Sequence, residues 1–90
     1  DMRGWFLLGL ILTLPLAAEE PIELIRKISS LELVGDRPGA IELARRGVES
    51  HPGSPELRAA YIFALARGGE EQKAVEAYHA YRAAFPNAPS

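Results

Sequence analysis

The chain offers few side chains that could do chemistry, and their spacing argues against an active site. It has two histidines, His51 and His79, and no cysteine. A metal site needs three or four converging ligands, so we expect both histidines to be solvated on the surface. Glu70 and Glu71 are neighbours that cannot face each other on a helix, so we expect a favourable helix start rather than an acid–base pair. These residues predict a non-enzymatic protein with no metal and no other cofactor.

The charge of the chain argues against nucleic acid as a partner. Ten Lys and Arg residues against twelve Asp and Glu residues give a net charge of -2, and proteins held by phosphate contacts are usually basic. Arg45 and Arg46 form a basic pair of the kind that binds phosphate or acidic partners. Glu42 stands at helical ion-pair spacing before them, so we expect a solvated, self-paired face.

An uncharged segment precedes the rest of the chain. Gly4–Ala18 has no charged residue, Arg3 lies before it, and Glu19 follows. A basic start, an apolar stretch and the small-residue exit Leu16–Ala18 are typical of a secretory signal peptide. As a helix, fifteen residues would reach roughly 22 Å, short of a ~30 Å hydrocarbon core. The sequence therefore divides into residues 1–20 and a body at residues 21–90.

Cleavage is not the only fate that the segment allows. A retained apolar helix could anchor the protein in a membrane or pack inside a protein assembly, and Arg3 would then mark the cytoplasmic side. In either case we expect the body to lie outside the cytoplasm, most simply in a bacterial periplasm or at the cell surface. The side chains expected to contact lipid or protein are Trp5, Phe6, Leu7, Leu8, Leu10, Ile11 and Leu12.

The body contains an internal repeat of 34 residues. Shifting the sequence by this interval aligns residues 21–56 with residues 55–90 and gives eight identical pairs, where unrelated segments would give about two or three. The pairs are Pro21/Pro55, Ile28/Ile62, Leu31/Leu65, Gly35/Gly69, Ala40/Ala74, Glu42/Glu76, Pro52/Pro86 and Pro55/Pro89.

This period and these residues resemble the tetratricopeptide repeat, a helix–turn–helix unit. The second copy has Gly69 at the turn, Ala74 early in the second helix, the aromatic Tyr78 four residues later, and Pro86 at the end. The first copy has Gly35, Ala40 and Pro52 in the matching places, with Ala44 at the aromatic position. The resemblance implies two stacked helical hairpins, at about residues 21–54 and 55–90.

Local signals predict the same all-α fold without the family. An apolar stripe from Ile22 to Val34 predicts a first helix, which Gly35 ends. Asp36 and Ser54 are expected to cap the second and third helices, and the fourth begins near Glu70. We expect the fourth helix to bury Ala74, Val75, Tyr78 and Tyr81. The predicted fold class is all-α: an apolar N-terminal helix is followed by two helical hairpins, and no segment is predicted to form a strand.

Two surfaces of the body are predicted to bind protein. The groove that the family forms from the first helix of each hairpin would present Ile22, Ile25, Ser29, Leu33, Ala59, Phe63, Ala66 and Arg67. The outer face of the last hairpin would present Tyr78, Tyr81 and Phe85 to a partner. The alternative is that Tyr78 and Phe85 face the preceding helix, and Tyr81 is then the best candidate for a partner contact. We therefore expect an interaction module that binds other subunits or itself, as an accessory or scaffold subunit of a membrane or cell-envelope assembly. The alternatives are a self-assembling subunit of a filament or oligomer, and a secreted soluble module.

Overall fold

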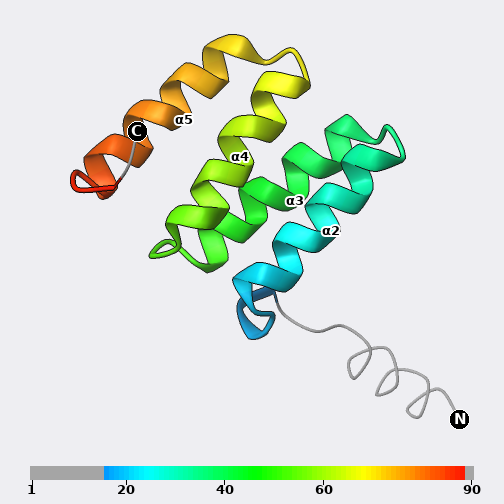
Figure 1. Cartoon of the computed structure of the whole chain (residues 1–90), viewed down its shortest axis with the longest axis horizontal. Helices are drawn as coiled ribbons and strands as arrows, with labels where there is room; N and C mark the ends of the chain where they lie inside the picture. The colour runs from blue at the N-terminus through cyan, green and yellow to red at the C-terminus, as the bar shows by residue number, and fades with distance from the viewer. Residues whose placement is uncertain (1–15, 89–90) are drawn as a thin grey trace, which may run out of the picture.

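The computed structural model describes residues 16–88, which are all-helical, as the sequence predicts (Figure 1). No strand occurs among these residues. The elements are the 3-10 turn η1 (Leu16–Ala18) and the helices α2 (Pro21–Leu33), α3 (Arg37–Ser50), α4 (Pro55–Arg67) and α5 (Glu71–Ala84). The apolar helix predicted before them lies largely outside the described residues. Among residues 16–88, each helix is too short or too polar to span a bilayer.

The helices begin and end at the residues that the sequence singles out. Asp36 accepts a hydrogen bond from the backbone N–H of Gly39 at 3.0 Å, and Ser54 caps α4 in the same way. Gly35 and Gly69 have φ of 85° and 81°, a left-handed conformation that only glycine adopts at little cost. These caps and stops confirm the predicted division into four helices.

The helices form two hairpins that lie side by side (Figure 1). The α3 helix packs between α2 and α4, and α2 also touches α4. Within residues 16–88, α5 packs against α4 alone. The core therefore lies among α2, α3 and α4, and α5 adds one buried side chain, that of Ala74. Its other members are Leu24, Ile28, Ala40, Ala44, Leu57, Ala64 and Leu65.

The apolar stripe that predicts α2 is buried only in its middle. The structure buries Leu24 and Ile28 and leaves Ile22 and Val34 exposed. A step of three residues falls short of a full helical turn by about 60°. The apolar positions spaced in this way therefore cover an arc of roughly 240° around the helix; they are Ile22, Ile25, Ile28, Leu31 and Val34. No single neighbour covers so wide an arc. The face that α3 and α4 cover is the narrower one with four-residue spacing.

Gly47 sets how closely α3 approaches its two neighbours. It is buried in the middle of the packing, and a Cβ added there would lie 3.2 Å from Leu57 Cδ2 and 3.7 Å from Leu24 Cδ1. Leucine side chains of α4 and α2 therefore converge on the bare backbone of α3. A larger residue at this position must push the helices apart.

Replacing Gly47 with valine tests this constraint. We expect Gly47→Val to lower the free energy of unfolding by about 1–3 kcal/mol through overpacking. The exposed neighbour Arg46 is the matched control, and Arg46→Val should change stability by no more than about 0.5 kcal/mol. Urea denaturation followed by circular dichroism measures both. Equal effects of the two variants would contradict the packing argument.

Candidate protein-interaction surfaces

The predicted groove lies on the side of the molecule where α2 meets α4. Two large apolar side chains point into solvent there: Leu33 is 88% exposed and Phe63 is 56% exposed. Ile22, Ser29, Ala66 and Arg67 are also exposed, while Ile25 and Ala59 are half-buried. Most of the predicted groove residues are therefore exposed. The exceptions are Ile25, which packs against the core, and Ala59.

The structure brings part of this set together at the ends of α2 and α4. A hollow of about 330 Å³ is lined by Ser29, Glu32, Leu33 and Arg67. Arg67 forms an ion pair with Glu32 across the two helices, with 2.9 Å between Arg67 Nη1 and Glu32 Oε1. The same guanidinium lies over the ring of Phe63, 5.6 Å from its centroid. The groove therefore has a defined end in which Arg67 links both helices.

Glu32 and Arg37 also belong to this end, although the sequence does not single them out. Arg37 donates a hydrogen bond from Nη1 to the Arg67 carbonyl oxygen at 2.6 Å, which satisfies one of the free carbonyls at the end of α4. Both contacts join residues at least 30 positions apart. Local spacing carries no signal for such pairs.

The aromatic side chains predicted for the end face form a row along α5. The rings of Tyr78 and Tyr81 stack with centroids 6.4 Å apart, and those of Tyr81 and Phe85 lie 5.9 Å apart. Arg58 of α4 sits 5.8 Å from the Phe85 centroid, so Phe85 packs toward α4. Tyr81, the residue that the sequence favours for a partner contact, is half-buried within the row, and Tyr78 is the more exposed at 37%.

Val75 extends the exposed part of α5. It is 55% exposed, so the prediction that α5 buries Val75 and Tyr78 is wrong. The physical reason is that no helix within residues 16–88 lies on that side of α5. The aliphatic Val75 and the aromatic Tyr78 are both exposed, and they form the apolar part of a second surface.

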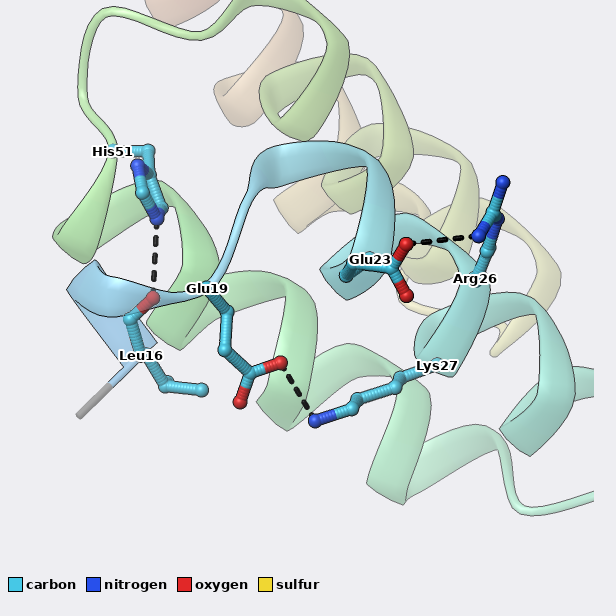
Figure 2. Close-up of polar contacts among 6 residues, drawn as sticks. All are labelled: Leu16, Glu19, Glu23, Arg26, Lys27 and His51. Atoms are coloured by element: carbon cyan, nitrogen blue, oxygen red, sulfur yellow. Dashed lines mark hydrogen bonds and ion pairs between the residues drawn. The ribbon is translucent and has the colours of Figure 1, made fainter. Parts of the chain in front are cut away.

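The end of the apolar segment is attached to the helical body (Figure 2). Leu16 packs against the core, and its carbonyl oxygen accepts a hydrogen bond from His51 Nε2 at 3.1 Å. Glu19 pairs with Lys27 of α2 at 2.6 Å. His51 is therefore a half-buried partner of Leu16, and the prediction of a fully solvated His51 is wrong. The seven apolar residues Trp5 to Leu12 named for membrane or protein contact lie outside the described residues.

Arg45, the first residue of the basic pair on α3, is paired with acidic neighbours. Arg45 is hydrogen-bonded to Glu42 and Glu49 on the same helix, as the Glu42 spacing predicts. Hydrogen bonding to Arg45, helped by the charges of Arg45 and Arg46, holds the pKa of Glu42 below its ordinary value of 4.5. A guanidinium engaged in this way is a poor phosphate ligand.

A second hollow, which the sequence does not predict, lies on α2 and α3. It has a volume of about 510 Å³ and combines apolar and charged lining: Glu23, Arg26, Lys27, Ser30, Leu31, Val34 and Leu43. Its charges already pair within α2 and with the residues before it, since Arg26 binds Glu23 and Lys27 binds Glu19 (Figure 2).

Comparison of the chain with family models, curated proteins and solved structures finds no match. Among residues 16–88, no cluster of three or more His, Asp or Glu side chains is placed to hold a metal ion. The candidate sites are therefore defined by their own geometry: the α2/α4 groove and the exposed stripe of α5.

The contact of Leu16 with the core is expected to contribute to stability. We expect Leu16→Ala to lower the free energy of unfolding by about 1 kcal/mol, since the side chain is only half-buried. Ala17 is exposed, and Ala17→Ser should leave stability unchanged. Thermal denaturation of the full chain compares the two. An unchanged Leu16 variant would show that residues 16–19 are not part of the folded body.

The Glu42–Arg45 pair predicts a pH dependence. Because its pKa is lowered in the folded chain, the charged Glu42 stabilises α3 above pH 4.5, and this contribution disappears as the pH falls through the lowered value. An NMR titration of the Glu42 carboxyl should have its midpoint below 4.5. In the Arg45→Gln variant the midpoint should return toward 4.5, and a midpoint unaffected by this substitution would contradict the assignment.

Proposed function

We propose that the protein is a tetratricopeptide-like, non-enzymatic interaction module that serves as an accessory or scaffold subunit. The observation that carries the proposal is the pair of exposed apolar side chains, Leu33 and Phe63, at a groove end fixed by Arg67. Exposed apolar groups beside ordered polar ones are typical of binding surfaces. The groove suits an apolar helix or strand of another subunit.

The helix bounds support the family resemblance. The first helix of each hairpin begins at Pro21 or Pro55, and the second begins at Arg37 or Glu71, so the 34-residue interval of the sequence recurs in the element bounds. Glycines with positive φ end the first helix of both hairpins. These features are the ones that a helix–turn–helix repeat requires.

The two ends of the molecule favour a subunit role over a head-to-tail filament. Inside the chain, the apolar residues Leu57 and Ala64 of α4 are buried. Residues 34 positions earlier on α2 are Glu23 and Ser30, both exposed. A second copy stacked by the same repeat geometry would bring α5 against this polar stripe. Such a junction lacks the apolar contacts that hold the two hairpins together.

A location in a membrane or cell-envelope assembly is the further part of this proposal, and it depends on residues 4–18. The mass of the protein purified from its native host tests it directly. A mass that includes these residues supports a retained anchor or packing segment. A mass that begins at Glu19 leaves a secreted module, and the membrane role is then abandoned.

Leu33 and Val34 provide a matched test of the groove. Both are exposed, at 88% and 79%, and they are adjacent at the end of α2, but only Leu33 lines the groove end. A photo-cross-linking residue at the exposed Ala66 position should capture a partner in cells of the native host. We expect Leu33→Asp to lower the yield of cross-linked product about tenfold, as loss of an interface anchor does.

Val34→Asp adds the same charge one residue away and should leave the yield unchanged. Circular dichroism of both variants should match the unsubstituted chain, since neither side chain is buried. Equal yields from the two variants would reject the α2/α4 groove as the binding surface.

A further inference from the structure

One stripe of α5 has the pattern of a helix-pairing seam. Glu71, Val75, Tyr78 and Arg82 are separated by steps of four, three and four residues, which is the spacing of a heptad seam. All four are exposed, and the two central ones are apolar or aromatic. The stripe is therefore apolar in the middle, acidic at its start and basic at its end.

The corresponding stripe of α3 is covered within the chain. Ala44, which stands 34 positions before Tyr78, is fully buried. Ile41, which stands 34 positions before Val75, is half-buried beside α4, since a Cβ added at Gly68 would lie 2.7 Å from its Cδ1. The packing inside the molecule thus places a helix on this side of α3. Residues 16–88 place no helix on the same side of α5.

The α5 stripe is complementary to itself. A two-fold axis passing midway between residues 76 and 77 would pair each α5 with an antiparallel copy. This axis puts Glu71 of one chain opposite Arg82 of the other, and Val75 opposite Tyr78. All four positions of the stripe then meet a suitable counterpart in one register, and both charge pairs are attractive.

We propose that the protein forms an isologous dimer through antiparallel pairing of α5 with α5 of a second copy. The pairing closes on itself, so it produces dimers and no fibre. It leaves the α2/α4 groove uncovered by α5 and does not depend on the function proposed for that groove. A dimer of this kind would present two grooves.

The size of the seam sets the expected affinity. The fourteen residues of α5 span about 21 Å at 1.5 Å per residue. A single helix pair of this length buries less than the roughly 1,600 Å² of a standard interface, so we expect a dissociation constant of about 10–500 µM.

Charge reversal in the full chain tests both the dimer and its register. Sedimentation equilibrium should show that Glu71→Arg and Arg82→Glu each weaken dimerisation roughly tenfold, because each places like charges opposite each other twice. The double variant should restore the affinity. An equimolar mixture of the two single variants should form a heterodimer, since all facing charges are then opposite.

The results expected from these variants distinguish an effect on dimerisation from an effect on the stability of α5. Both single changes oppose the helix dipole, so a stability effect would be greatest in the double variant. Glu76→Arg makes the same charge change on another side of α5 and should leave dimerisation unchanged. Val75→Glu should abolish the dimer. A chain that remains monomeric up to about 1 mM, or a double variant that is not restored, would overturn the proposal; the first result would leave the stripe to a different protein.

Discussion

The close approach of α3 to α2 and α4 is the constraint on which the rest of the structure depends. The fully buried residues of α3 are Ala40, Ala44 and Gly47, so the innermost face of this helix carries only small residues. Leu24 of α2 and Leu57 of α4 supply the volume that fills the contact. Because large side chains of α2 and α4 pack against small residues of α3, a body of about seventy residues can bury a continuous core.

This constraint holds in the first hairpin and is absent from the second. Tyr78 and Tyr81 stand 34 positions after Ala44 and Gly47, so α5 cannot accept another helix at the same close distance. The aromatic row of Tyr78, Tyr81 and Phe85 gives α5 a bulky aromatic face at one edge of the molecule. At the opposite edge, α2 presents the charged Glu23 and Lys27. This difference favours contact between the α5 edges of two copies over head-to-tail stacking, because the α5 stripe complements itself and lacks an apolar counterpart on the charged edge of α2.

The sequence predicts where the helices begin and end more accurately than which faces they bury. Asp36, Ser54 and Gly69 act through their own backbone or a neighbour three residues away, so their effect is visible in the local sequence. The exposure of Val75 depends instead on the absence of a covering helix. The His51–Leu16 contact joins positions 35 residues apart. Such outcomes require knowing which elements lie next to each other, and one sequence does not contain that information.

The polar contacts at the groove end would reduce the entropy lost when the proposed partner binds there. Glu32 and the ring of Phe63 hold the Arg67 side chain from two sides, and Arg37 binds the Arg67 carbonyl oxygen. Ion pairs at an exposed position add little stability, but these contacts restrict the positions of the groups that they join. A partner that packs on Leu33 and Phe63 then meets a surface whose polar members are already in place, and fewer side chains must be ordered on binding.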